Sequence, residues 1–274
     1  MRELNYTNVS KYIIDWLDSY AKDSSVKGFT IGVSGGIDSG VVSTLLAMTG
    51  LPVLILDMPI HQKQDEVTRA QNHITWLKSK YTNVSSSKVD LTDAYDTLYE
   101  TFAPNSGLIS KEDFDFSMGN TRSRLRMTTL YQFAGMYKYL VAGTGNKVED
   151  LGIGYFSKYG DGGVDLSPIG DLMKSEVYSL GAELGLLDEI LTAIPTDGLH
   201  DDGRTDESDI GCKYSELEDI MINVIGDSDI MDSEVYHKLE KTLVGRQLEV
   251  FKIYAKYHIS NKHKMLPIPV CLLS

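Results

Sequence analysis

The stretch FTIGVSGGIDSGVV, residues 29–42, decides the fold and points to a ligand. Six apolar or small residues favour a β-strand, and two glycines then leave that strand through a turn without bulky side chains. A helix beginning near Ile37 adds free backbone N–H groups and the positive end of its dipole, which together suit a phosphate. Asp38 would repel a phosphate unless a cation such as Mg²⁺ lies between them. The stretch therefore favours a loop for a metal-bound nucleotide; the alternative is a tight turn in which Asp38 and Ser39 cap the helix.

The whole chain predicts a cytoplasmic protein with one large domain, or one domain with a helical extension. It has 274 residues and a formal net charge of −13, so nonspecific nucleic-acid binding is unexpected unless basic residues cluster. Its two cysteines, Cys212 and Cys271, lie far apart and do not have metal-ligand spacing. No signal-peptide pattern and no apolar run of membrane-spanning length is visible, so we expect no membrane contact.

The order of the predicted elements favours an α/β fold with a doubly wound parallel sheet and a helical C-terminal part. Strands are expected at 28–34, 51–58, 84–90 and 139–146. Helices are expected at 9–20, 38–49, 64–81, 92–102, 110–138, 171–184, 186–192, 214–225 and 230–257. Residues 193–211 are long, polar and glycine-rich, which is typical of a mobile lid.

Two strand ends carry groups that suit a nucleotide, although the chain has neither a Walker A pattern nor GxGxxG. SGGIDS follows the first strand, and GTGNKVED follows the strand part of the later segment, at 139–143. Ligands of open α/β sheets bind beyond the carboxyl ends of the strands, so Asp38 and Glu149 could hold one Mg²⁺. The alternative for Glu149 is a solvated acid in the first turn of a helix.

Two further segments contain charged residues that suit a polyanion. GNTRSRLRM, residues 119–127, carries three arginines; Arg122 and Arg126 share a helix face, and Arg124 points elsewhere. The alternative is a surface helix with salt bridges. The second segment is KYGDGGVDLSPIGDLMKSEV, residues 158–177, in which acids and lysines surround glycines. The alternative to a ligand site is a turn in which Asp171 caps a helix.

Taken in order, these segments resemble a known family. SGGIDS resembles the SGGxDS loop of the N-type ATP pyrophosphatases, which have the adenine nucleotide alpha hydrolase-like fold. GNTRSRLRM, followed by GTGNKVEDLGIGYFSKYGDGGVDLSPIGDLMKSEVYSLGAELG, resembles NAD synthetase over about residues 30–212. The chain is too short to include a glutaminase domain, so it resembles the ammonia-dependent form with a single domain over 1–274.

The resemblance implies a reaction with ATP, deamido-NAD and ammonia, and Mg²⁺ as cofactor. ATP would transfer AMP to the nicotinate carboxylate of deamido-NAD with release of pyrophosphate, and ammonia would then displace AMP to give NAD. Family members are homodimers, so a homodimer is expected here as well.

The resemblance also implies site residues. It places ATP contacts at Ser34, Gly35, Gly36, Ile37, Asp38, Ser39, Gln64, Arg69, Arg124, Thr144, Lys174 and Thr196. It places the magnesium carboxylates at Asp38 and Glu149, and catalytic groups at Asp161 and Lys174. It places deamido-NAD contacts at Asn120, Lys158 and Asp165.

Departures from the family pattern occur in the lid and near the C-terminus. The lid carries Asp197 and Arg204 in place of small and amide side chains, and Lys262-His263-Lys264 stands where the family tends to have His-Lys-Arg. Two other readings stay open: an ATP pyrophosphatase that adenylates a nucleobase or a tRNA, and a nucleotide sensor without activity. The net charge opposes a tRNA enzyme, and the joint presence of Asp38, Glu149 and Asp161 with Lys174 opposes a sensor.

Overall fold

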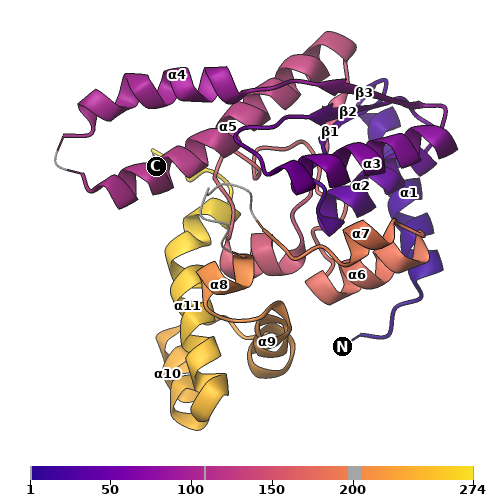
Figure 1. Ribbon diagram of the computed structural model, residues 1–274. Coiled ribbons are helices and arrows are strands. Elements are labelled where there is room, and N and C mark those ends of the chain that lie inside the picture. Colours follow the sequence, from indigo (N-terminus) through magenta and orange to yellow (C-terminus); the bar gives the residue numbers. More distant parts are fainter. Residues whose placement is uncertain (1, 108, 197–204, 274) are drawn as a thin grey trace.

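A parallel sheet lies at the centre of the computed structural model, which describes residues 2–107, 109–196 and 205–273 (Figure 1). Its strands are β1 (Phe29–Gly32), β2 (Val53–Asp57), β3 (Val84–Lys88) and β4 (Leu140–Val141). The order across the sheet is β3-β2-β1-β4, and each neighbouring pair is parallel. Two strands thus follow β1 on one side, and the chain then returns to add β4 on the other side.

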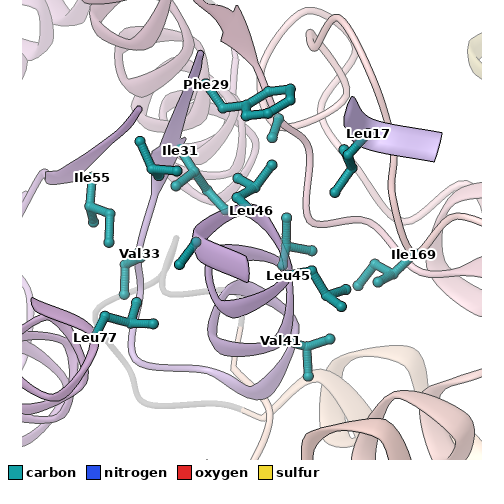
Figure 2. Close-up of a cluster of buried hydrophobic side chains, with 14 of the residues drawn as sticks. Leu17, Phe29, Ile31, Val33, Val41, Leu45, Leu46, Ile55, Leu77 and Ile169 are labelled. Atoms are coloured by element: carbon teal, nitrogen blue, oxygen red, sulfur yellow. The ribbon is translucent and has the colours of Figure 1, made fainter. Parts of the chain in front are cut away.

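Strand β2 shows why helices cover both faces of the sheet. Its five residues are all buried, and the side chains of the first four alternate between two separate apolar clusters. Val53 and Ile55 pack in the cluster shown in Figure 2, with residues of α1 (Tyr6–Asp23), α2 (Ile37–Met48) and α3 (Gln64–Lys80). Leu54 and Leu56 pack on the opposite face, with residues of α4 (Thr92–Phe102) and α5 (Lys111–Tyr137). The expectation of a doubly wound parallel sheet is therefore confirmed.

The C-terminal part is helical, as predicted, and has its own apolar cluster. Phe251 is fully buried in this cluster, together with Leu217 and the two residues Val148 and Ile153 that follow the sheet. A short 3₁₀ helix, η1 (Ala103–Asn105), lies between α4 and α5. The helical elements after β4 are η2 (Val148–Ile153), α6 (Lys174–Glu183), α7 (Asp188–Leu191), α8 (Asp206–Ile210), α9 (Tyr214–Asp219), η3 (Ile220–Ile225), α10 (Ser233–Thr242) and α11 (Gly245–Met265). Both η2 and η3 are π-helical, and η3 continues α9.

Two predicted helices differ from the observed ones. The segment 230–257 forms two helices, because Val244 is extended and Gly245 has a φ of +55°, which ends the helical path between α10 and α11. Helix α6 begins at Lys174 and not at 171, since the Met173 N–H donates to the Glu176 carboxylate over 2.9 Å. Asp171 is therefore not the N-cap.

The segment predicted as a lid contains a short helix, and the predicted fourth strand is shorter than expected. Within 193–211, residues 206–210 form α8, whose N-cap is Thr205; Asp197 and Arg204 lie outside the described residues. The strand expected at 139–146 is only two residues long, and Ala142 extends it by a single parallel bridge to Leu166. Gly145 lies beyond it, where a Cβ would stand 2.0 Å from a carboxylate oxygen of Asp150. None of the helices in the described part of the chain is long and apolar enough to cross a membrane.

Candidate active site at the switch point of the sheet

The carboxyl ends of β1 and β4 meet at the point where the strand order reverses. The loop after β1 leads into α2, and the loop after β4 leads into η2. In a parallel sheet these two loops leave in different directions and open a crevice between them. A cavity of about 720 Å³ lies at this position and is lined by both loops, by α5, by the segment 154–164 and by the end of α11.

The loop after β1 presents backbone donors to this cavity. Gly36 is the N-cap of α2, and no side chain caps the first turn of that helix. The Ser34 and Ser39 hydroxyls lie 3.2 Å apart, and the Ser39 hydroxyl also donates to the Gly36 carbonyl over 3.1 Å. The loop is thus held from within by two serines, and the N–H groups at the start of α2 stay available to an anion.

Lys174 lies between two carboxylates at the floor of the site. Its ammonium nitrogen is 2.6 Å from Oδ2 of Asp38 and 2.9 Å from Oε1 of Glu149. Its side chain is only 4 % exposed, so this is an ion cluster inside the protein. Asn146 donates to the other oxygen of Asp38 over 3.2 Å, and the Tyr214 hydroxyl lies 2.7 Å from Oε1 of Glu149. Each carboxylate is therefore oriented by a second partner.

The charges of this cluster depend on one another. Burial opposes a charge on Lys174, but Asp38 and Glu149 outweigh it, so the pKa of the ammonium is raised. Burial also opposes the charge of Glu149, yet Lys174 and Tyr214 bring its pKa below the usual value. For Asp38 the effect of burial prevails, and its pKa is raised. The single lysine thus offsets the two negative charges only in part.

Asp161 forms a second polar centre on the cavity wall. Its Oδ1 accepts hydrogen bonds from the Ser123 hydroxyl at 2.7 Å and from the Ser157 N–H at 2.9 Å. Its own N–H donates back to the Ser123 hydroxyl over 2.8 Å, so the carboxylate has a fixed orientation. Solvent reaches the side chain through the cavity, but protein surrounds it closely, and this desolvation raises the pKa of Asp161 despite its hydrogen bonds.

Basic side chains line another part of the same cavity. Arg124 donates to the Lys158 carbonyl over 3.2 Å, and the Lys158 ammonium donates to the His263 carbonyl over 3.0 Å. Lys264 at the end of α11 donates to the Phe156 carbonyl over 2.7 Å and lies over the Phe156 ring. These contacts join α5, the glycine-rich segment and α11 around a positively charged part of the wall that suits a nucleotide phosphate.

The cavity brings together most of the predicted site residues. The predicted residues on its wall are Ser34, Gly36, Ile37, Asp38, Ser39, Arg69, Asn120, Arg124, Thr144, Glu149, Lys158, Asp161, Lys174 and Thr196. The arginine segment behaves differently from the prediction. Arg124 and Arg126 both line the cavity, whereas Arg122 is buried with its guanidinium 4.9 Å from the Tyr95 ring centre.

Gly35, Gln64 and Asp165 do not line the cavity. Gly35 lies in the loop itself with a φ of +85°, and Gln64 is exposed at the start of α3. The Asp165 carboxylate accepts from the Val141 N–H at 2.8 Å and from the Tyr131 hydroxyl at 3.0 Å. These bonds fix the short strand β4 against the next segment, which gives Asp165 a structural task.

Residues that the sequence did not single out complete the site. Asn146 and Asp150 stand within the GTGNKVED segment, and burial together with three nearby carboxylates raises the pKa of Asp150 to about 8. Only their position beside Glu149 in the sequence indicates that these two residues belong to the site. Tyr214 lies 65 residues from Glu149 and had no local signal, since only the packing of α9 brings its hydroxyl to the carboxylate. Lys264, in the C-terminal segment that departs from the family pattern, also lies on the cavity wall.

Comparison with known proteins identifies the family. The profile of the NAD synthase family matches residues 9–266. The chain is 34 % identical to the NH(3)-dependent NAD(+) synthetase of Carboxydothermus hydrogenoformans, over 84 % of this chain and 90 % of the relative. It is 37 % identical to the enzyme of the same name from Sulfolobus acidocaldarius, over 99 % of this chain and 91 % of the relative.

Solved structures agree with this assignment. The NMN synthetase of Francisella tularensis superposes with a TM-score of 0.79 at 29 % identity, covering 99 % of this chain and all of that one. The NH3-dependent NAD synthetase of Campylobacter jejuni superposes with a TM-score of 0.70 at 24 % identity, covering 98 % of this chain and all of that one, and shows the shared adenine nucleotide alpha hydrolase-like fold. The family profile matches almost the whole chain, and the fold and the cavity at the switch point of the sheet agree with that match. The protein therefore belongs to the NAD synthase family.

Proposed function

We propose that this chain is an ammonia-dependent NAD synthetase, which uses ATP to adenylate the nicotinate carboxylate of deamido-NAD and then replaces AMP by ammonia. The observation that carries the proposal is the position of Lys174. Its ammonium lies with two carboxylates beside the uncapped start of α2, at the crevice where an open α/β sheet binds its ligand.

The first step transfers AMP to a carboxylate. A carboxylate oxygen of deamido-NAD attacks the α-phosphorus of ATP, and the bond to the bridging oxygen breaks as pyrophosphate leaves. The N–H groups at the start of α2 stabilise the leaving pyrophosphate, since they point to the place where its charge develops. Lys174 lines the same cavity, and its ammonium would stabilise the negative charge on the α-phosphate oxygens in the transition state.

The second step forms the amide. Ammonia attacks the acyl carbon, AMP leaves with the bonding electrons, and the new nitrogen loses a proton. Asp161 suits the role of proton acceptor because Ser123 and the Ser157 N–H hold its carboxylate in place and its surroundings raise its pKa. Arg124 and Lys158 would hold phosphates of the two nucleotides at the basic part of the wall.

The donor set fits Mg²⁺. Asp38 Oδ2 and Glu149 Oε1 are hard oxygen donors that already converge on one cation, the Lys174 ammonium. Residues 2–107, 109–196 and 205–273 contain no cluster of three or more His, Cys, Asp or Glu able to hold a metal, so the remaining ligands would be phosphate oxygens and water. When bound there, Mg²⁺ would neutralise charge on the β- and γ-phosphates as pyrophosphate departs.

The acyl acceptor has a second candidate. The Francisella tularensis protein that superposes with a TM-score of 0.79 is named an NMN synthetase, and the deamido form of NMN is nicotinate mononucleotide. A mononucleotide presents the same carboxylate to the same cavity. Deamido-NAD remains the first choice because the relatives at 34 % and 37 % identity are named NAD synthetases. Homodimer formation, a cytoplasmic location and a lid over 193–211 remain predictions.

One assay tests the proposal. The purified chain is incubated with ATP, Mg²⁺ and an ammonium salt, together with deamido-NAD, with nicotinate mononucleotide, or with neither. We expect pyrophosphate and NAD to appear with deamido-NAD and neither product in its absence. Faster amidation of the mononucleotide would establish the second candidate, and release of pyrophosphate with neither acceptor amidated would refute the proposed function.

A further inference from the structure

The position of the Lys174 ammonium between two carboxylates bears on how the site binds a metal ion. Its ammonium occupies the point at which the Asp38 and Glu149 carboxylates converge, 2.6 Å from one and 2.9 Å from the other. These distances are those of charge-assisted hydrogen bonds. A cation held directly by both oxygens would have to sit where this nitrogen now lies.

Neighbouring side chains hold the two carboxylates in an orientation that favours a cation at that point. Asn146 holds the second oxygen of Asp38, and Tyr214 holds the oxygen of Glu149 that faces Lys174. The Tyr214 ring lies 4.8 Å from the ammonium, and its hydroxyl is also 3.0 Å from Asp206. The pocket around the ammonium is thus lined by carboxylates, an amide and an aromatic face, all of which favour a positive charge.

A divalent cation cannot join this cluster while the ammonium stays. Two positive centres within about 4 Å repel each other by several kcal/mol at the effective dielectric constant of a protein interior. The ammonium must therefore leave, and a buried lysine needs another anion to receive it. Triphosphate bound at the start of α2 supplies that anion beside the same carboxylates.

We infer that Lys174 acts as an internal counter-ion that keeps the Asp38–Glu149 pair closed to free divalent cations until a nucleotide triphosphate takes over its ammonium. The inference rests on the proposed function, since it takes this pair as the magnesium ligands. Metal and nucleotide then bind together, and the same movement brings the lysine to the phosphate that it stabilises. If the nucleotide bound and drew Lys174 away without a metal ion, Asp38 and Glu149 would have no cation. If the metal bound without a nucleotide, the Lys174 ammonium would have no anion.

Binding of Mn²⁺ tests the inference without measuring turnover. Titration of the nucleotide-free protein, followed by electron paramagnetic resonance of free Mn²⁺, gives the affinity directly. Wild type is expected to bind Mn²⁺ weakly, and Lys174→Met at least ~10-fold more tightly because the two carboxylates lose their counter-ion. Lys147→Met is the matched control, since Lys147 pairs with Asp171 on the surface at 2.8 Å and does not line the cavity. Equal affinity of Lys174→Met and wild type would overturn the inference.

A second measurement covers the case in which Lys174→Met does not fold. Wild type and Glu149→Gln are titrated with Mn²⁺ alone and with Mn²⁺ plus an ATP analogue that cannot be cleaved between the α- and β-phosphates. The inference expects Glu149→Gln to weaken binding only when the analogue is present. Weakening by Glu149→Gln without the analogue would show an open site and contradict the inference. No effect in either case would refute the metal ligands of the proposed function itself.

Discussion

The ammonium group of Lys174, the first residue of α6, lies 2.6 Å from the carboxylate of Asp38 in the first turn of α2, although 136 residues separate them. Both helices begin at the same crevice, so their positive ends face the same volume. The negative charge of Asp38 and Glu149 balances that local excess and prepares the site for a metal–phosphate complex. The following variants test the parts assigned to these residues.

Asp38→Asn should reduce turnover at least ~100-fold, since an amide neither binds Mg²⁺ as a carboxylate does nor pairs with Lys174. Excess Mg²⁺ should restore little of the lost rate, because the ligand itself is changed. The measurement is kcat at saturating ATP over a series of Mg²⁺ concentrations. A near-normal kcat would exclude Asp38 as a metal ligand.

Lys174→Met should lower kcat by ~100-fold or more and change the KM for deamido-NAD by only a few-fold, because the charge is needed mainly in the transition state. Steady-state kinetics with each substrate varied separates the two parameters. Lys147→Met, which removes a half-buried lysine that does not line the cavity, should leave both parameters near wild type. A rise in KM with an unchanged kcat would make Lys174 a ground-state binding residue.

Asp161→Asn should separate the two chemical steps. The amide cannot accept a proton from ammonia, so formation of NAD should fall by ~100-fold or more, while the first release of pyrophosphate continues. A single-turnover experiment that quantifies pyrophosphate and NAD in the same samples gives both rates. If the two products fell in parallel, Asp161 would act before ammonia enters the reaction.

Much of the fold could be predicted from local patterns. The strands 29–32 and 53–57 are apolar runs buried on both faces, and the glycine turn after the first of them fixes the start of α2. The break between α10 and α11 could not be predicted in the same way, because Val244 and Gly245 interrupt an otherwise helical pattern without a proline. The start of α6 depended on Glu176, whose side chain fixes the Met173 N–H.

The site was predictable where its residues follow a strand, and less so elsewhere. Asp38 and Glu149 stand in the first turns of the helices that follow two neighbouring strands, so topology brings them to one crevice. The family resemblance implies that Asp165 contacts deamido-NAD, and this stays a prediction; in the structure its carboxylate binds the Val141 N–H and the Tyr131 hydroxyl, a task that no local pattern indicates. Tyr214 reaches the site only through the packing of the C-terminal helices, which no local pattern reports.

Gly35→Ala should impair nucleotide binding as well as stability. Gly35 has a φ of +85°, and an added Cβ would lie 3.0 Å from the Glu66 carbonyl oxygen and 3.1 Å from the Ala70 nitrogen. The loop must therefore shift away from α3, and we expect the KM for ATP to rise ~10-fold, with a loss of stability of about 1–3 kcal/mol.

Gly50→Ala is the control that introduces backbone strain without steric contacts of the added Cβ. Gly50 has a similar φ of +77°, but no atom lies within 4 Å of an added Cβ, and the residue is remote from the cavity wall. This variant should lose stability and keep the wild-type KM for ATP. Equal KM values for both alanine variants would mean that the conformation of Gly35 does not shape the nucleotide site.

His73 should make the protein less stable in acid. It is fully buried, its Nε2 lies 2.8 Å from the Ser43 hydroxyl, and burial lowers its pKa to about 4. In the unfolded chain the His73 imidazole binds a proton below its ordinary pKa of ~6.5, whereas in the folded chain it does so only near pH 4. The unfolded state therefore gains protons first, and stability falls as the pH decreases from 6.5 to 4. Between pH 8 and pH 5 this amounts to about 2 kcal/mol.

His73→Gln measures this contribution, because glutamine retains a hydrogen-bonding side chain that does not titrate. Urea unfolding at pH 8 and pH 5 should show a loss of stability that is about 2 kcal/mol smaller in the variant than in wild type. Since the comparison is between two pH values, any general cost of the substitution cancels. If His73→Gln and wild type lost equal stability in acid, the pKa of His73 would be the same in the folded and unfolded states. Burial of the neutral imidazole would then not explain the loss of stability at low pH.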